Sequence, residues 1–272
     1  MDWWQAVALG IVEGITEYLP VSSTGHLILT QQLLKIPAGE AADAYAICIQ
    51  AGAILAVLGL YWPRVRQMLR GMRGRDPQGR SLAINILVAF LPAVVIGLFF
   101  DAAIEKYLFG LWSITAAWLG GGLVILLVSR WRLARRPGPD MGKSLEELPW
   151  GMALVIGLAQ CLAMWPGTSR SLVTILGGIL AGLSLSGAVE FSFLLGVVTL
   201  TAAAGYKAVY GGLAMVQAYS WPTMLTGFIF AALSAAVAVK WMVGYLNRHS
   251  LAVFGWYRIV LAAVVMVLLA IR

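Results

Sequence analysis

The chain has 272 residues, of which 61% are hydrophobic and only 11% are charged, and its formal net charge is +7. Soluble domains carry about 25% charged residues, so this composition excludes a soluble protein. It predicts an all-α polytopic membrane protein, organised as a single membrane domain over residues 1–272. The positive charge does not indicate nucleic acid, and no nucleic-acid partner is expected, because basic residues also gather in the cytoplasmic loops of membrane proteins.

The predicted elements begin with an apolar stretch at residues 3–36 that Pro20 breaks midway. Each half is too short to cross a bilayer, which takes about 20 mostly apolar residues, so we expect a re-entrant helix hairpin. Such a break is tolerated at membrane depth where protein or a water-filled cavity surrounds it. Three transmembrane helices are expected to follow, at residues 44–62, 82–100 and 111–129.

The second half of the chain has the same order of elements. Residues 150–184 are apolar but are broken at Pro166 and Gly167, so a second re-entrant hairpin is expected there. Three more transmembrane helices, which bring the expected total to six, are placed at residues 188–206, 223–243 and 252–271.

The two broken stretches are related to each other. A shift of 147 residues lays Ser22 on Ser169, and each hairpin is followed by three spans. Because three is odd, the second unit must enter the membrane from the opposite side, which predicts an inverted-topology repeat with a binding site where the broken helices meet. The first repeat is expected over residues 1–140 and the second, inverted repeat over residues 141–272.

Two clusters of basic residues predict the orientation of the chain. One lies within residues 63–81 and the other within residues 130–149, and the positive-inside rule assigns both to the cytoplasm. This assignment puts both termini and the mouth of the first hairpin on the outer, periplasmic side. The active site of this multi-pass protein is therefore expected to face that side.

Glu13 and Glu17 lie one helical turn apart in an apolar stretch, so both carboxylates project from one face. Burying two acids in apolar surroundings costs several kcal/mol unless a cation meets them. Carboxylate oxygens and substrate phosphate are the ligands of Mg²⁺ or Ca²⁺ in such sites, so the pair predicts a divalent-cation site. Gln160 and Met164 replace the pair in the second half, so only the first half is expected to hold metal.

Each break is followed by hydroxyl residues and a restarting helix. The free N–H groups and the dipole of a helix N-terminus bind phosphate, and Arg170 adds a planar guanidinium suited to phosphate oxygens. Hydroxyls also satisfy broken backbone in membrane helices, so a structural role stays open for Ser22, Thr168 and Thr174. The expected diphosphate-binding residues are Ser22, Thr24, Gly167, Thr168, Ser169, Arg170, Ser171 and Thr174.

Ser23 and His26 follow the first break directly. The pKa of histidine suits general acid–base work near neutrality, and Ser23 is a candidate nucleophile that would form a phospho-enzyme. Direct attack by water is the competing route, and both routes stay open at this point. The expected catalytic residues are Ser23, His26, Glu17 and Arg170.

Two segments carry a resemblance to a known family. The sequence EGITEYLPVSSTGH, from Glu13 to His26, and the sequence PGTSRSLVT, from Pro166 to Thr174, closely resemble the undecaprenyl-diphosphate phosphatase family of the bacitracin-resistance type. They match its (E/Q)xxxE, SSTGH and PGxSRSxxT motifs. The similarity extends over essentially the whole chain.

The resemblance implies an enzyme of the inner (plasma) membrane of a bacterium. Such an enzyme hydrolyses the C55 lipid undecaprenyl diphosphate to undecaprenyl phosphate and orthophosphate with the help of a divalent cation. It would recycle the lipid carrier of cell-wall synthesis and confer bacitracin resistance, with a polyprenyl diphosphate lipid in the bilayer as its partner. By resemblance, the positions tied to activity are Glu13, Glu17, Ser23, His26 and Arg170.

Two other functions share features with this sequence. Inverted repeats with broken helices are also a transporter architecture, so a transporter or flippase for a phosphorylated polyprenyl lipid is the alternative. The phosphatidate-phosphatase type of lipid phosphatase is excluded, because the His and Asp that its third motif requires are Leu176 and Leu180 here. A homodimer remains open from the sequence.

Overall fold

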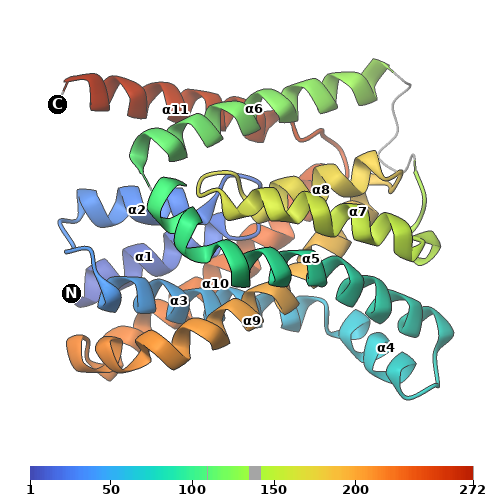
Figure 1. Ribbon diagram of the computed structural model, residues 1–272, viewed down its shortest axis with the longest axis horizontal. Helices are drawn as coiled ribbons and strands as arrows, with labels where there is room; N and C mark the ends of the chain where they lie inside the picture. Colours follow the sequence, from blue (N-terminus) through green and yellow to red (C-terminus); the bar gives the residue numbers. More distant parts are fainter. Residues whose placement is uncertain (109, 135–141, 272) are drawn as a thin grey trace.

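The computed structural model describes residues 1–108, 110–134 and 142–271. Over these ranges the chain is helical and forms no β-strand (Figure 1). The first half contains α1 (Trp3–Thr16), α2 (Ser23–Leu33), α3 (Glu40–Leu60), α4 (Trp62–Met72), α5 (Pro77–Leu108) and α6 (Leu111–Ala134). The second half contains η1 (Leu145–Glu147), α7 (Trp150–Gln160), η2 (Cys161–Met164), α8 (Arg170–Leu180), α9 (Leu185–Ala218), α10 (Trp221–Leu246) and α11 (Ala252–Ile271).

Six helices of the described chain are long and apolar enough to cross a membrane, which confirms the six spans that the sequence predicts. They are α3, α5, α6, α9, α10 and α11. Helix α5 is longer than the span expected at residues 82–100. It has 32 residues and therefore extends about 48 Å at 1.5 Å per residue. Since the hydrocarbon core is about 30 Å thick, this helix continues well beyond it.

The loop expected at residues 63–81 contains a helix that the sequence analysis missed. Helix α4 buries Val65 and Met68 partly against the core, while Arg66 and Arg70 on its other side are exposed. Apolar residues three apart form one helical face, but the dense arginines hide this pattern in a reading based on hydropathy alone.

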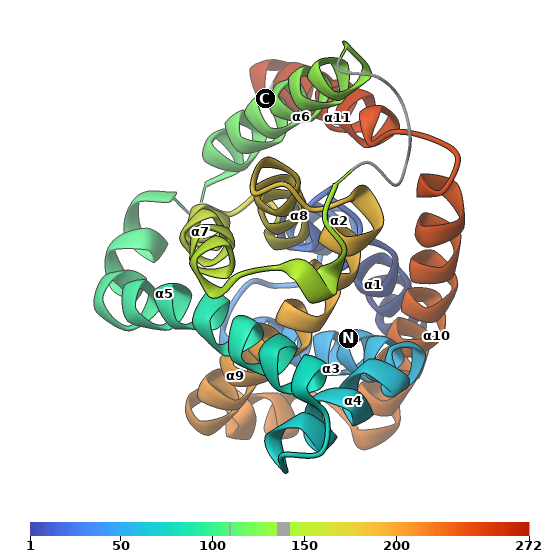
Figure 2. The ribbon, with the colours of Figure 1, turned by 90° about the vertical axis from the view of Figure 1, so that its right-hand side faces the viewer.

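Both broken stretches form pairs of short helices. Helix α1 has 14 residues, and α2, α7 and α8 have 11 each, so each is about 16–21 Å long and none crosses a bilayer of about 30 Å alone. The two breaks face each other near the middle of the molecule in Figure 1. Figure 2 shows α1, α2 and α8 near the centre of the molecule, with α7 between α5 and α8.

The helices of the two halves pack against each other in matching pairs. Helix α1 packs on α10 and α7 packs on α5, while α3 packs on α9 and α6 packs on α11. Such pairing is what two inverted copies of one unit would produce. The expected boundary between residues 140 and 141 lies outside the described residues, so the extents of the two repeats stay a prediction.

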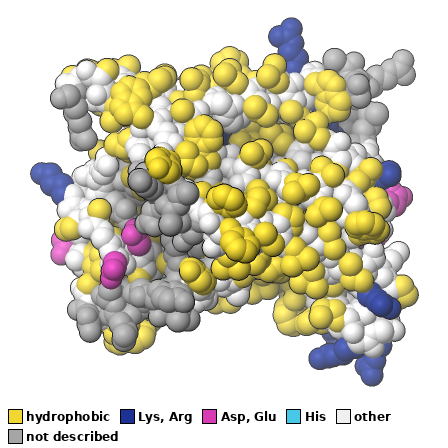
Figure 3. Space-filling view, viewed as in Figure 1, with side chains coloured by type: hydrophobic (Ala, Val, Ile, Leu, Met, Phe, Trp, Pro, Cys, Tyr) yellow, Lys and Arg dark blue, Asp and Glu magenta, His cyan; other side chains and the backbone are white. Residues whose placement is uncertain are grey.

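The surface is apolar over the part that would face lipid. Leu91, Val95 and Leu98 on α5 are more than half exposed, as fits a helix with a lipid-facing side. Figure 3 shows hydrophobic side chains over most of the visible face, with Lys and Arg gathered near α4 at one end. The fold is that of a multi-pass membrane protein.

The interface of α3 with α10 predicts a sensitive position at Gly52. A methyl group there would overlap the backbone oxygen of Phe228, whereas Gly59 in the same helix has no neighbour within 4 Å. Overpacking typically costs about 1–3 kcal/mol, so Gly52→Ala should lower the thermal unfolding midpoint by several degrees. Gly59→Ala should leave it unchanged or higher, and equal midpoints would contradict this helix contact.

Candidate functional site

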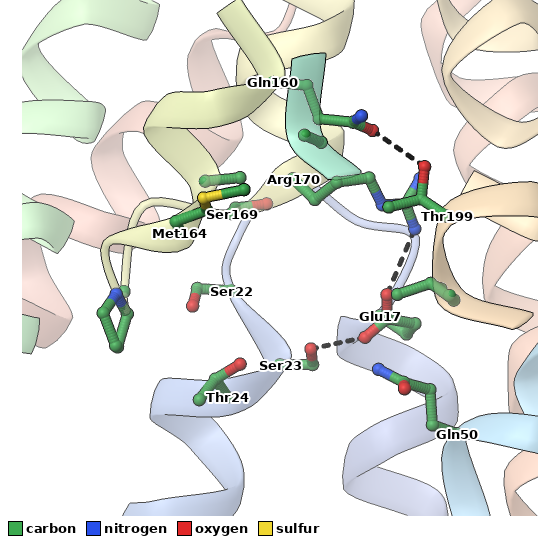
Figure 4. Close-up of a pocket in the computed structure, with 15 residues that line it drawn as sticks. Glu17, Ser22, Ser23, Thr24, Gln50, Gln160, Met164, Ser169, Arg170 and Thr199 are labelled. Carbon is green, nitrogen blue, oxygen red and sulfur yellow. Dashed lines mark hydrogen bonds and ion pairs between the residues drawn. The ribbon is translucent and has the colours of Figure 1, made fainter. Parts of the chain in front are cut away.

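The two breaks bring three chemical groups together. Glu17 ends the first broken helix, Ser23 starts α2 and Arg170 starts α8. Nη2 of Arg170 lies 3.1 Å from Oε1 of Glu17, and the Ser23 hydroxyl donates to Oε2 of Glu17 at 2.5 Å (Figure 4). One carboxylate thus links a hydroxyl of the first half to a guanidinium of the second half.

These groups line a cavity of about 210 Å³ between the hairpins. Of the residues expected from the sequence, the cavity brings together Glu17, Ser22, Ser23, Thr24, Gly167, Ser169 and Arg170. One part of the wall is polar and another is apolar, which suits a ligand with a charged head and a hydrocarbon tail. The apolar lining residues are Ala93, Ala163, Met164, Pro166 and Leu200.

The backbone of the two breaks is strained at matching positions. Ser22 caps α2 with a φ of 74°, and Ser169 caps α8 with a φ of 77°. Non-glycine residues in such a conformation cost of order 1–3 kcal/mol and cluster at functional sites. This geometry lets α2 and α8 start, and the first N–H groups of each helix have no partner inside the helix.

Arg170 is held by contacts on several sides. Its Nη1 donates to the carbonyl of Ser192 at 2.9 Å, and its guanidinium carbon lies 5.1 Å from the ring centroid of Tyr18. Gly196 leaves room for it, because a methyl group there would overlap Nη1. Nε is buried and has no hydrogen-bond partner among the described residues, so its N–H is available to an anion.

Glu13 lies one turn before Glu17 and is only 1% exposed. Its Oε2 is buried without a hydrogen-bond partner in the described part of the chain. An unpaired buried carboxylate oxygen is costly, and a hard divalent cation is a suitable partner for it. The donor set at Glu13 and Glu17 therefore fits the expected Mg²⁺ or Ca²⁺, although Glu13 does not line the cavity itself.

Ser171, Thr174 and Thr168, expected to bind phosphate, do not reach the cavity. Ser171 is fully buried and donates to the carbonyl of Leu19 at 2.9 Å. Thr174 is also fully buried, with its hydroxyl 2.7 Å from that of Ser192. The first of these bonds ties the two breaks to each other and the second ties α8 to α9, so the side chains support the turns rather than line the pocket.

His26 also lies outside the cavity lining. Its Nδ1 is 2.7 Å from the carbonyl oxygen of Ser22, so Nδ1 carries the proton and Nε2 accepts from the hydroxyl of Tyr257, also at 2.7 Å. The imidazole stacks on the Tyr257 ring, with the ring centroids 5.7 Å apart. Both nitrogens are therefore engaged away from Ser23, whose own partner is Glu17.

The cavity also contains polar residues that the sequence analysis did not place there. Gln50, Gln160 and Thr199 line it, and Thr199 donates to Oε1 of Gln160 at 3.2 Å. The signal for Gln160 was present, since it is the counterpart of Glu13 in the second half. Thr199 lies inside an apolar span, where a lone hydroxyl usually bonds to its own helix.

Comparisons with known proteins agree with the resemblance seen in the motifs. The family described as bacitracin resistance protein BacA matches residues 6–264. Undecaprenyl-diphosphatase 2 of Rhodospirillum rubrum is 46% identical over 96% of this chain and 93% of its own length. The undecaprenyl-diphosphatase of Sorangium cellulosum is 44% identical over 98% of this chain and 86% of its own. That of Methylococcus capsulatus is 42% identical over 97% and 94%.

Proposed function

Because the chain belongs to the bacitracin resistance protein BacA family, we propose that the cavity between its two breaks is where it hydrolyses undecaprenyl diphosphate. The protein is a membrane hydrolase that releases orthophosphate and leaves undecaprenyl phosphate. This reaction returns the lipid carrier of cell-wall synthesis and underlies bacitracin resistance. The observation that carries the proposed site is the chain of contacts from Ser23 through Glu17 to Arg170.

Ser23 acts as the nucleophile in this proposal. Its hydroxyl donates to Glu17 at 2.5 Å, so the carboxylate can take the proton as Oγ attacks the terminal phosphorus. The new Oγ–P bond forms while the bond from phosphorus to the bridging oxygen breaks, and undecaprenyl phosphate leaves. Water then cleaves the phosphoserine and gives orthophosphate. His26 holds the carbonyl of Ser22 and so orients this turn.

Arg170 binds the diphosphate in this proposal. Nε lacks a partner among the described residues and Nη2 contacts Glu17, so both N–H groups can turn to phosphate oxygens. A planar guanidinium matches two such oxygens at once. Charge that develops on the transferring phosphoryl group is stabilised by such fixed donors more than in water. The N-termini of α2 and α8 add to this field.

Glu13 and Glu17 would hold the divalent cation. When bound, the cation supplies charge that grips the phosphate oxygens and offsets the negative charge on the leaving phosphate. The described residues form no group of three or more His, Cys, Asp or Glu side chains able to bind a metal. Phosphate oxygens and water must therefore complete the ligand set, which is usual for Mg²⁺, and metal and substrate should bind together.

The lipid tail would leave the cavity along its apolar wall, past Ala163 and Met164. The exposed arginines near α4 lie at one end of the molecule and the N-terminus lies at the other (Figures 1 and 3). With the basic end in the cytoplasm, the protein is oriented in the bacterial inner membrane with its active site toward the periplasm. A transporter is not favoured, because the curated relatives carry the names of hydrolases.

Phosphate release in detergent tests this proposal. The purified protein should release orthophosphate from undecaprenyl diphosphate. EDTA should lower the turnover rate at least about a hundred-fold, because the cation would stabilise the negative charge on the leaving phosphate. Excess Mg²⁺ or Ca²⁺ should restore it. Glu13→Gln should raise the cation concentration needed for half-maximal activity, and an unchanged requirement in that variant would contradict the metal assignment. Light scattering of the same sample reports whether the protein forms the homodimer that the sequence leaves undecided.

A further inference from the structure

Arg258 has an unusual environment for a charged residue. It lies in the last transmembrane helix, α11, and is 0% exposed. Its guanidinium donates to four backbone carbonyls, and it has no carboxylate partner within the described residues. A buried charge without a counter-ion is costly. Because the burial of this charge is unfavourable, we expect Arg258 to have a role other than packing.

The carbonyls that Arg258 binds belong to three different segments. Nη1 donates to Pro20 in the first break at 3.2 Å, and Nη2 donates to Gly167 in the second break at 2.8 Å. The remaining two are Ala117, at 2.9 Å from Nη2, and Trp118, at 3.3 Å from Nε, both on α6. One guanidinium therefore joins both breaks and the α6–α11 pair.

We infer that Arg258 is a positioning residue for the proposed hydrolysis, on which this inference rests. It fixes the two breaks relative to each other, so that Ser23 from one and Arg170 from the other meet at Glu17. It lies outside the cavity lining and does not touch the reacting groups itself.

The geometry of the second break explains why an external hold is needed. Gly167 has a φ of +94° and lines the cavity, and a glycine can leave this conformation at little steric cost. Arg170 follows three residues later. A rotation of the Gly167 peptide would move the start of α8, and a misplacement of about 1 Å can cost a hundred-fold in rate. The hydrogen bond from Arg258 to the Gly167 carbonyl opposes that rotation.

Gly121 on α6 provides the space that the guanidinium occupies. A methyl group there would overlap Nη2 of Arg258, whereas Gly120, its neighbour in the chain, has no atom within 4 Å of such a methyl. The two glycines therefore form a matched pair of test positions. Gly121→Ala displaces the guanidinium without removing it, and Gly120→Ala controls for the added methyl group.

Steady-state kinetics and amide hydrogen exchange test the inference. Arg258→Met keeps a long unbranched side chain, although a shorter one than arginine, and removes a buried charge, a change that cores often tolerate, so the variant should fold. Its kcat per folded molecule should fall about a hundred-fold with KM within about threefold. Gly121→Ala should lower kcat at least about tenfold, and Gly120→Ala should match the wild type. In the Arg258→Met background, Gly121→Ala should add little, since both changes act through one group.

Amide hydrogen exchange tests the positioning role of Arg258 without measuring turnover. Amides at residues 19–25 and 166–172 should exchange faster in Arg258→Met and at the wild-type rate in Gly120→Ala. Unchanged exchange in those turns, or a kcat within threefold of wild type in Arg258→Met, overturns the positioning role. So does a fully additive effect of the two substitutions. A wild-type protein that releases no phosphate would instead remove the proposed function, and the exchange data would still judge this inference.

Discussion

Ser23→Ala should lower kcat for phosphate release from undecaprenyl diphosphate by at least about a thousand-fold, since removal of a nucleophile that acts with its base can cost up to about a million-fold. The hydroxyl of Ser23 donates to the Glu17 carboxylate at 2.5 Å. Loss of the hydroxyl leaves Glu13, Glu17 and Arg170 in place, so substrate binding should change little. The measurement is steady-state kinetics with purified variant and wild-type protein.

A control for this variant is Ser81→Ala at the exposed start of α5. This variant also loses a serine hydroxyl, but at a position that does not line the cavity, and it should keep full activity. If Ser23→Ala retained more than a tenth of the wild-type kcat, water rather than Ser23 would be the attacking group. Glu17 would then be the base for that water, and the cavity would remain the site.

Arg170→Ala should lower kcat/KM by about a hundred- to a thousand-fold, the usual cost of removing a donor that stabilises developing negative charge. The loss should appear in KM as well as in kcat, because Arg170 is expected to hold the diphosphate before and during transfer. Glu17 would also lose its cationic partner, now 3.1 Å away. Thermal unfolding should be followed in parallel, so that the kinetic loss is referred to folded protein.

Gly196→Ala tests the position of Arg170 without removing it. A methyl group at Gly196 would overlap Nη1, whereas Gly205 in the same helix α9 has no neighbour within 4 Å. Gly196→Ala should therefore reproduce a large part of the Arg170→Ala loss, and Gly205→Ala should behave as the wild type. Equal activity of the two glycine variants would show that Arg170 does not act from the conformation described.

Much of the fold followed from the sequence because its signals are strong. Apolar runs of about 20 residues predict spans, and a proline or Pro-Gly followed by hydroxyls predicts a break. The meeting of Glu17, Ser23 and Arg170 was expected from the predicted inverted repeat, in which the two broken helices would meet. The helix α4 was missed because the arginines outweigh its few apolar residues in mean hydropathy.

The directions of individual side chains could not be predicted in the same way. Ser171 and Thr174 belong to the phosphate-binding motif, yet the first turn of α8 directs both into the protein. The ring of His26 turns toward Tyr257, more than two hundred residues later in the chain. Arg258 stands out in the sequence as a charge inside a span that should pair or snorkel, but its partners could not be predicted, because they are backbone carbonyls, which every residue has. Such contacts depend on the tertiary fold.

The central claim is that the Ser23 hydroxyl attacks the terminal phosphorus of undecaprenyl diphosphate. The most direct measurement is rapid acid quenching of the wild-type protein during turnover of substrate labelled in its terminal phosphate, followed by mapping of the labelled peptide. We expect an acid-stable phosphoserine at Ser23 that forms and decays at rates compatible with kcat. Full turnover without any labelled protein at any time point would contradict it.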